Sequence, residues 1–405
     1  MKIVQINAVN HFSSTGRTTA ELHAFLKQHG HESHVFCSNE SNEADNVHLV
    51  GSRFDHKLHA LLSRITGRQA CFSSAATARM VEQLRQIRPD AVIIRNFHAN
   101  YVNMPQLLTY LAREDVPVIA VMHDCWFFTG HCSHYTAVGC QKWRTECHHC
   151  RHLDAGNVTW FVDPSRHMFR LKQRLFAAIP RLAVVGVSKW ITDEAAQSPI
   201  FANARSFTPI YNWIDLNKFR PRPVDDLKDH LGLTGEFVVL GVAQGWGSHK
   251  GIQYFIDLAR RHPQIRVILV GSIAERPTLP PNLWMVGATA NVDQLAQYYS
   301  LANCLLVCSP QETFGKVSAE ALACGTPVIA HNATANPEVA GTECGYIIHR
   351  DHPDQIDAAL SAIAHADPAA RAALSQRCIS RATHLFNLPT QAQKYLTLIQ
   401  SLQEC

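Results

Sequence analysis

Short runs of apolar and β-branched residues alternate along the chain with longer stretches of helical periodicity. In the first half, strands are expected at residues 2–7, 34–36, 91–95, 118–122 and 184–187. Helical stretches such as 19–28 and 166–178 lie between them. Because consecutive parallel strands need a long crossover connection, usually a helix, this alternation predicts a parallel sheet with helices on both faces.

The alternation pauses between about residues 201 and 231, where prolines and turn-forming residues interrupt it, and then restarts. Further strands are expected at residues 237–242, 266–270, 283–286, 304–308 and 327–330. We therefore predict an α/β fold of two doubly wound, Rossmann-like domains, residues 1–205 and 206–405, and the last helix is a candidate to pack back on the first domain. Ligands of such folds bind outside the carboxyl ends of the strands, so we expect the site in a cleft between the domains.

Composition excludes several other classes of protein. No run of 18 apolar residues is present, so no transmembrane helix is expected, and the first residues lack the charged and apolar regions of a signal peptide. We therefore expect a cytoplasmic protein. The formal net charge is only +4 and no nucleic-acid-binding motif is present, so nucleic acid is not an expected partner.

Two glutamates in the second half stand where a ligand is expected. Glu312 lies in the loop after the strand at 304–308. Phe314 and Gly315 open the next helix, and Glu320 lies about one and a half turns inside it. Carboxylates beside the free N–H groups of a helix N-terminus suit a ligand that carries both hydroxyls and phosphates. Two glutamates at this spacing are often only solvated charges, but the apolar neighbours of Glu320 argue against that alternative.

Glycines and basic residues follow other strands. Lys250 stands just before a helix that begins near residue 252, where it is a natural contact for a diphosphate; the alternative is a solvated lysine. Gly271 ends the next strand, where its missing side chain would let a ligand approach the backbone. In the first half, Gly16 and Arg17 open the helix after the first strand, and a solvated side chain is the alternative for Arg17.

Histidines follow two buried strands of the first half. His123 and Asp124 come directly after the strand at 118–122. His98 comes shortly after the strand at 91–95. Because the carboxyl ends of parallel strands meet at one edge of a sheet, we expect these side chains in one site. A structural, hydrogen-bonded histidine is the alternative for His123.

These motifs together resemble those of the GT-B retaining glycosyltransferases of family 4. The resemblance rests on Gly-x8-Lys-Gly at 241–251, the strand that ends at Gly271, Glu312-x7-Glu320 and Ala-Cys-Gly-Thr-Pro-Val-Ile at 323–329. The linker at 212–221 is also similar to the family's, with Trp213 where glycine is usual. The resemblance covers nearly the whole chain, is most specific in the last 200 residues, and is strongest to the bacterial exopolysaccharide and O-antigen branch.

The resemblance implies a role for each candidate residue of the second half. Glu312 would contact hydroxyls of the donor sugar near the anomeric carbon, and Glu320 would hold the ribose hydroxyls. Lys250 would bind the donor diphosphate, with help from the backbone N–H groups of Phe314 and Gly315. No carboxylate is clearly a nucleophile, so the resemblance implies front-face substitution, in which the departing diphosphate helps to deprotonate the attacking hydroxyl.

The resemblance also implies an acceptor side in the first domain. Family members carry a histidine at the position of His123, and His98 is a second acceptor-side candidate. The family usually pairs its lysine with a nearby arginine, which this chain lacks, and either Arg17 or His249 could supply that second cation. No divalent metal and no cofactor are implied for the transfer step.

A glycosyltransferase is therefore the expected function. It would move a hexosyl group from a UDP- or GDP-sugar to a saccharide or lipid-linked oligosaccharide acceptor in surface polysaccharide biosynthesis. Two alternatives stay open: a sugar-nucleotide epimerase or phosphorylase on the same fold, and a non-catalytic, zinc-stabilised sugar-binding protein. An epimerase would act on the sugar nucleotide alone, whereas a transferase needs an acceptor.

Four cysteines lie in a segment of little regular pattern, an insertion at about residues 125–155. They are Cys132, Cys140, Cys147 and Cys150. One Cys-x2-Cys pair with two more thiols fits a tetrahedral structural zinc site, in which a nearby histidine could replace one thiolate. The alternatives are four unligated thiols or a disulfide pair. Because the cluster follows His123 closely, we expect it to shape the acceptor side of the site.

An amphipathic stretch suggests contact with a membrane. Phe54, Leu58, Leu61, Leu62 and Ile65 recur at helical spacing, with Arg53, Lys57, Arg64 and Arg68 among them. A second basic stretch spans residues 166–174. Basic amphipathic helices dock on anionic lipid, which would place the protein peripherally at the cytoplasmic face of the inner membrane. The alternative is a surface helix that packs its apolar face on the sheet.

Overall fold

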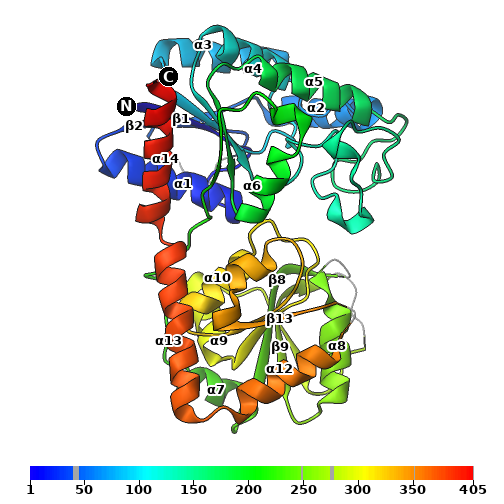
Figure 1. The fold of residues 1–405 in the computed structure, drawn as a ribbon, viewed down its shortest axis with the longest axis vertical. Coiled ribbons are helices and arrows are strands. Elements are labelled where there is room, and N and C mark those ends of the chain that lie inside the picture. The colour runs from blue at the N-terminus through cyan, green and yellow to red at the C-terminus, as the bar shows by residue number, and fades with distance from the viewer. Residues whose placement is uncertain (40–44, 248–249, 274–277, 351, 405) are drawn as a thin grey trace. The chain divides into compact units, whose positions relative to one another are not determined.

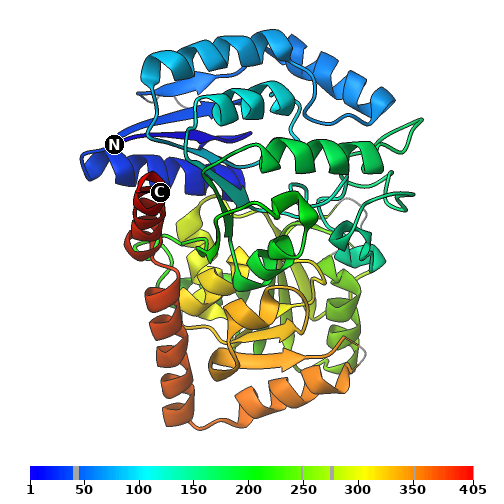
Figure 2. The same cartoon turned by 45° about the horizontal axis from the view of Figure 1, so that its top comes forward.

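The structure, a computed structural model, describes residues 1–39, 45–247, 250–273, 278–350 and 352–404 (Figure 1). The chain divides into two compact units: the first comprises Met1–Tyr211 together with the residues from Gln391 onward, and the second comprises Asn212–Thr390. Each unit is a parallel sheet with helices on both faces (Figure 2). This arrangement confirms the prediction of two doubly wound, Rossmann-like α/β domains.

The sheet of the first unit has the strand order β3-β2-β1-β4-β5-β6-β7, and all neighbouring strands are parallel. Its strands are β1 Lys2–Ile6, β2 Glu32–Cys37, β3 Val47–Leu49, β4 Ala91–Ile94, β5 Val118–Met122, β6 Leu182–Gly186 and β7 Ser206–Pro209. Its helices are α1 Ser13–Gln28, α2 Arg53–Thr66, α3 Ser74–Ile87, α4 Met104–Arg113, α5 Ser165–Ala177, α6 Lys189–Ala196 and most of α14 Leu388–Gln403. The central strands are fully buried, because helices cover both faces.

The sheet of the second unit has the order β10-β9-β8-β11-β12-β13, again all parallel. Its strands are β8 Val238–Trp246, β9 Arg266–Ile273, β10 Leu283–Gly287, β11 Cys304–Val307, β12 Val328–His331 and β13 Gly345–Ile348. Its helices are α7 Asp225–Leu231, α8 Ile252–Arg261, α9 Val292–Leu301, α10 Lys316–Ala323, α11 Asn336–Ala340, α12 Asp354–His365 and α13 Pro368–Leu385. Apolar side chains of β8, β9, β11, α8 and α12 form one buried core.

Both sheets reverse their winding at one place. In the first unit the chain moves outward on one side of β1 and returns to the other side at β4, and in the second unit β8 and β11 have the same relation. Loops at the carboxyl ends of the two strands beside such a switch point diverge and leave room for a ligand. The topology therefore places one candidate ligand position in each unit.

The strand prediction is incomplete at the sheet edges. β3, β7 and β13 were not expected, and each lies at the edge of its sheet. Their residues are mainly half-exposed or exposed, so these strands lack the continuous apolar run of a central strand. Because β7 belongs to the first sheet, the first unit extends to Tyr211 and does not end at residue 205.

Candidate active site

Lys250 and Glu312 form an ion pair at the switch point of the second unit. Lys250 precedes α8, which follows β8, and Glu312 lies in the loop after β11. Lys250 Nζ lies 2.5 Å from Glu312 Oε1, and the two side chains are 31% and 18% exposed. The structure thus brings together the two residues that were predicted to bind the diphosphate and the sugar, and solvent reaches both. His249, the alternative second cation, lies outside the described residues.

The loop that carries Glu312 is fixed by the chain after β12. The backbone N–H of Glu312 donates to Thr334 Oγ1 at 2.9 Å, and the N–H of Ala335 donates to the carbonyl oxygen of Glu312 at 3.1 Å. The fully buried Asn336 donates from Nδ2 to the carbonyl oxygen of Ser309 at 3.0 Å. These bonds hold the glutamate's backbone in place independently of its ion pair.

The N-terminus of α10 opens beside Glu312. Gly315 is the N-cap residue with φ 82°, a conformation that glycine adopts without strain, and no side chain caps the helix. The N-terminus of a helix is a position where backbone N–H groups can bind an anion. The Phe314 ring is buried and packs edge-on against Phe386, with centroids 5.2 Å apart, so Phe314 offers only its backbone.

Two other predicted donor contacts already have partners within the protein. Glu320 is 4% exposed, and its Oε2 accepts a hydrogen bond from Tyr299 Oη at 2.9 Å. Its role as a ribose contact stays a prediction. Gly271 has φ 125°, and a Cβ there would lie 1.7 Å from the carbonyl oxygen of Ala243. The missing side chain of Gly271 therefore accommodates the neighbouring strand β8, and its role as a donor contact stays a prediction.

Gly16 and Arg17 lie in the first turns of α1, after the loop that follows β1. A Cβ on Gly16 would lie 3.2 Å from Val9 Cγ2, so the glycine lets this loop fold tightly over the helix. His11 and Ser13 adopt φ 67° and 59°, which costs energy for residues with side chains. Asn10 is 1% exposed, and its amide oxygen and nitrogen have no hydrogen-bond partner in the described part of the chain.

Arg95, which the sequence analysis did not select, holds His123. Arg95 follows β4 directly, is 1% exposed and donates from Nη1 to His123 Nε2 at 2.9 Å. It also donates from Nη2 to Gln5 Oε1 at 3.2 Å, and its guanidinium lies 5.9 Å from the ring centre of Tyr395 in α14. Because arginine only donates, His123 Nε2 must be the acceptor and carry no proton. Removal from water, and then the Arg95 charge, hold the pKa of His123 well below its usual range.

His98 and Asp124 lie beside this pair. His98 Nε2 lies 3.3 Å from Asp124 Oδ2. Asp124 Oδ1 accepts a hydrogen bond from the backbone N–H of Trp126 at 2.8 Å, and the His98 ring is tilted against the Trp126 indole with centroids 5.6 Å apart. The residues after β4 and β5 therefore bring His98, His123 and Asp124 together with Arg95 at the carboxyl-terminal end of the first sheet.

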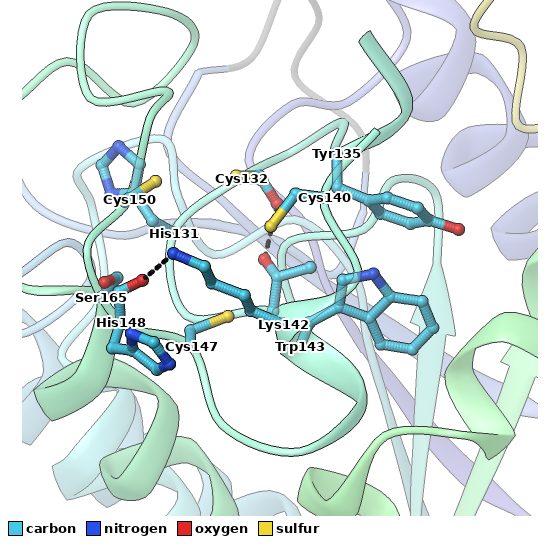
Figure 3. Close-up of a pocket in the computed structure, with 11 residues that line it drawn as sticks. His131, Cys132, Tyr135, Cys140, Lys142, Trp143, Cys147, His148, Cys150 and Ser165 are labelled. Carbon is cyan, nitrogen blue, oxygen red and sulfur yellow. Dashed lines mark hydrogen bonds between the residues drawn. The ribbon is translucent and has the colours of Figure 1, made fainter. Parts of the chain in front are cut away.

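The four predicted zinc ligands line one small cavity in the insertion (Figure 3). The cavity has a volume of about 20 Å³, room for a single water molecule or ion. The Cys132 and Cys150 thiols interact, and this interaction lowers the pKa of Cys150 and raises that of Cys132. Within the described residues no three His, Cys, Asp or Glu side chains are already arranged to hold a metal ion. Zinc at this position stays a prediction.

Of the other polar groups around this cavity, two histidine nitrogens have no partner in the described chain and two lysines donate to backbone carbonyl oxygens. His131 Nε2 and His148 Nδ1 are buried and make no hydrogen bond to any described residue. Lys142 Nζ donates to the carbonyl oxygens of His148 and His149 at 3.0 and 3.1 Å. Lys172 of α5 is fully buried and donates to the carbonyl oxygen of Thr129 at 3.0 Å, and burial lowers the pKa of Lys172 to about 7.

Comparison with known proteins identifies the class to which this fold and site belong. Residues 15–218 match the family described as Glycosyltransferase Family 4, and residues 225–384 match Glycosyl transferases group 1. Two Rossmann-like units with candidate ligand positions at their switch points are the GT-B architecture. The chain belongs to glycosyltransferase family 4.

The curated relatives match this chain over only part of their own length. Spore coat protein SA of Bacillus subtilis is 29% identical over 194 residues, which cover 41% of this chain and 51% of that protein. A D-inositol 3-phosphate glycosyltransferase of Mycobacteroides abscessus is 31% identical over 153 residues, 34% of each chain. Alpha-galactosylglucosyldiacylglycerol synthase of Streptococcus pneumoniae is 31% identical over 141 residues, 30% of this chain and 37% of that one.

Solved structures share the fold over the whole chain. Sucrose-phosphate synthase of Thermosynechococcus elongatus has a TM-score of 0.68 at 18% identity, covering 99% of this chain and 98% of that one. HepE of Anabaena, solved with UDP and glucose, has a TM-score of 0.68 at 17% identity, covering 99% and 100%. WaaG, described as a glycosyltransferase involved in lipopolysaccharide biosynthesis, has a TM-score of 0.61 at 14% identity, covering 96% and 98%.

Proposed function

We propose that this protein transfers a hexosyl group from a nucleoside-diphosphate sugar to a saccharide acceptor, with retention of the anomeric configuration. The observation that carries the proposal is the Lys250–Glu312 pair at the switch point of the second unit. A cation and a carboxylate at this position, beside an uncapped helix, match a ligand that has a diphosphate at one end and sugar hydroxyls at the other. The HepE complexes with UDP and UDP-glucose favour UDP as the nucleotide.

The chemistry assigns separate tasks to the two side chains. On donor binding, Lys250 exchanges the Glu312 carboxylate for a phosphate oxygen, and Glu312 becomes free to accept hydrogen bonds from sugar hydroxyls. The bond between the anomeric carbon and the diphosphate oxygen breaks, and a bond to the acceptor oxygen forms on the same face. The acceptor proton passes to the departing diphosphate. Lys250 and the N–H groups of α10 stabilise the charge that develops on this leaving group.

For the acceptor we propose a lipid-linked oligosaccharide of surface polysaccharide biosynthesis. The names of two similar proteins support a lipid acceptor: alpha-galactosylglucosyldiacylglycerol synthase, and WaaG, a glycosyltransferase involved in lipopolysaccharide biosynthesis. His123, His98 and Asp124 form a polar cluster at one sheet edge of the first unit that suits hydroxyl groups. Because Nε2 of a neutral His123 accepts from Arg95, its proton lies on Nδ1, which makes Nδ1 a hydrogen-bond donor to such a hydroxyl.

For the insertion we propose a structural zinc ion bound by the four cysteines. The support is the shared cavity and the two histidine nitrogens left without partners in the described chain. The thiols would have to turn toward the cavity centre to reach tetrahedral geometry. Zinc in this position would order a segment with almost no regular secondary structure, and it would take no part in transfer.

A donor panel on the purified protein tests the proposed function. Nucleotide release should depend on a saccharide acceptor, and the product should keep the donor's anomeric configuration. Glu312→Gln should lower the rate at least about 100-fold, since it weakens contacts to the reacting sugar. The matched control is Asp354→Asn, an exposed carboxylate of the same unit, which should leave the rate unchanged. Conversion of the sugar nucleotide without an acceptor would favour an epimerase. If the protein consumed none of the donors, a non-catalytic sugar-binding protein would be favoured.

A further inference from the structure

Helix α2 presents its apolar residues to solvent. Phe54 is 72% exposed, Leu58 and Leu61 are each 44% exposed, and Ile65 is 38% exposed. These residues recur at helical spacing and share one face. The residues that α2 buries are polar, His59 and Ser63. An ordinary surface helix is oriented the other way round, so the alternative, in which this apolar face packs on the sheet, is wrong.

Well-formed contacts hold α2 in this orientation. His59 Nδ1 is hydrogen-bonded to Ser73 Oγ at 2.8 Å, and the imidazole packs edge-on against Phe72. Ser52 and Asp55 form a complete capping box at the start of the helix. The exposed apolar face is therefore a property of a capped and anchored helix.

A second exposed apolar segment adjoins α2. Trp160, Phe161 and Val162 are 52%, 74% and 45% exposed. The backbone N–H of Trp160 donates to the carbonyl oxygen of Arg64 at 2.8 Å, and the Arg64 guanidinium lies 5.9 Å from the indole centre. The segment precedes α5, and the residue after α2 touches the start of that helix: a Cβ on Gly67 would lie 2.4 Å from Pro164 Cγ.

These two segments form one patch. We define the α2–162 patch as Phe54, Leu58, Leu61, Ile65, Trp160, Phe161 and Val162. Among the described residues, eleven large apolar side chains are exposed, and seven of them belong to this patch. Single exposed apolar residues are normal, but such a concentration marks an interaction surface.

The charges around the patch indicate what covers it. Arg53, Lys57, Arg64 and Arg68 are all exposed on or directly after α2. The acidic residue of α2, Asp55, is engaged by the backbone N–H and hydroxyl of Ser52. Arg166 and Arg170 at the start of α5 are also exposed, and Glu146 pairs with both. Aromatic and aliphatic side chains beside such an excess of cations match the boundary of an anionic bilayer better than an acidic or apolar protein face.

We propose that the α2–162 patch docks the protein on the surface of a membrane rich in anionic lipid. Phe54, Trp160 and Phe161 enter the boundary between headgroups and acyl chains, and the basic side chains contact lipid phosphates. The inference stands on the patch alone. It deepens the proposed function, because a lipid-linked acceptor is met at such a surface.

Vesicle co-sedimentation of the full chain tests this proposal. Binding to vesicles of phosphatidylglycerol and phosphatidylcholine should be at least about tenfold tighter than to phosphatidylcholine alone, and it should weaken with salt. The double variant Phe54→Ser/Phe161→Ser should bind these vesicles about tenfold more weakly or worse, because two large side chains no longer enter the membrane. Lys57→Glu/Arg68→Glu should remove the preference for phosphatidylglycerol. Tyr346→Ser, an exposed aromatic of the second unit, is the matched control and should bind like the unchanged protein.

Two results would overturn the proposal. The first is that the double variant keeps its melting temperature and binds vesicles as tightly as the unchanged protein. The second is that the unchanged protein self-associates and the double variant does not. The proposal and the proposed function fail separately. Transfer to a soluble saccharide acceptor should survive in the double variant, whereas a protein that binds vesicles but never transfers sugar would contradict only the function.

Discussion

At the scale of single residues, Arg95 orients His123 and determines which of its ring nitrogens accepts a hydrogen bond. The guanidinium is buried, donates to the imidazole and to Gln5, and lies over Tyr395 of the last helix. Sequence reasoning selected His123 from its place after β5 but passed over Arg95, although it ends β4 in the same way. An arginine after a buried strand is usually solvated, and only the folded structure shows that this one is enclosed.

Arg95→Met should raise the pKa of His123 toward its ordinary value, because a neighbouring cation and a fixed donor are removed. NMR titration of the His123 ring measures this shift, and the pH profile of transfer should move with it. Arg95→Lys keeps the charge and should retain part of the effect. A His123 titration that is unchanged in Arg95→Met would contradict the positioning role of Arg95.

His331 predicts a loss of stability in acid. It is 2% exposed, and burial lowers its pKa from 6.5 to about 4. Between these two pH values the unfolded chain binds a proton that the folded chain does not, so stability falls as pH falls from about 6.5 to about 4. Between pH 7.5 and pH 5, His331→Leu should reduce this loss by at most about 2 kcal/mol. Urea unfolding at pH 7.5 and pH 5 measures it, with the exposed His384→Leu as the control; equal pH dependence in His331→Leu and the unchanged protein would refute it.

At the scale of elements, the apolar pattern predicted the central strands and failed at the edges. β5 was predicted with its observed bounds because every residue is buried. β7 was taken for linker because its half-exposed residues resemble a loop. The orientation of α2 could not be predicted either: periodicity shows that a helix has an apolar face, but the partner of that face depends on tertiary contacts such as His59 to Ser73.

Gly271 tests the packing of β8 against β9. Gly271→Ala forces a Cβ onto the Ala243 carbonyl oxygen and should destabilise the second unit by about 3 kcal/mol. Gly235 is the matched control, because its φ of 124° is close to the 125° of Gly271 but its Cβ would meet open space, so Gly235→Ala should cost only about 1 kcal/mol. Denaturant unfolding compares the two. Equal costs would show that backbone conformation alone, and not the approach of β8, requires glycine at 271.

The cysteine cluster makes a separate prediction for the insertion. Metal analysis of purified protein should find about one zinc per chain. Cys147→Ser and Cys150→Ser should lose it, and a chelator should lower the melting temperature. Cys71→Ser, outside the cluster, should keep the metal. Absence of zinc together with normal melting in chelator would rule out the site and leave the thiol contact of Cys132 and Cys150 as a candidate disulfide.

At the scale of the whole molecule, the sequence predicted the class of fold because two rounds of strand–helix alternation admit few other arrangements. It also located Lys250 and Glu312, since topology places the ends of β8 and β11 together. Partners that depend on side-chain packing were not predictable, such as Tyr299 for Glu320 or Ala243 beside Gly271. What the sequence predicts well is therefore what backbone topology alone determines.

The most direct test of the donor site compares binding of the donor with binding of its nucleoside diphosphate by calorimetry. Lys250→Met should weaken the binding of both ligands by about tenfold or more, because each carries the diphosphate that Lys250 is proposed to contact. Glu312→Gln should weaken binding of the sugar nucleotide at least about tenfold, because Glu312 is assigned to the sugar. Binding of the nucleoside diphosphate should be unchanged or tighter, because the carboxylate no longer competes with phosphate for Lys250. The assignment of this ion pair to the donor would be wrong if Glu312→Gln weakened the binding of both ligands equally, or if Lys250→Met weakened the binding of neither.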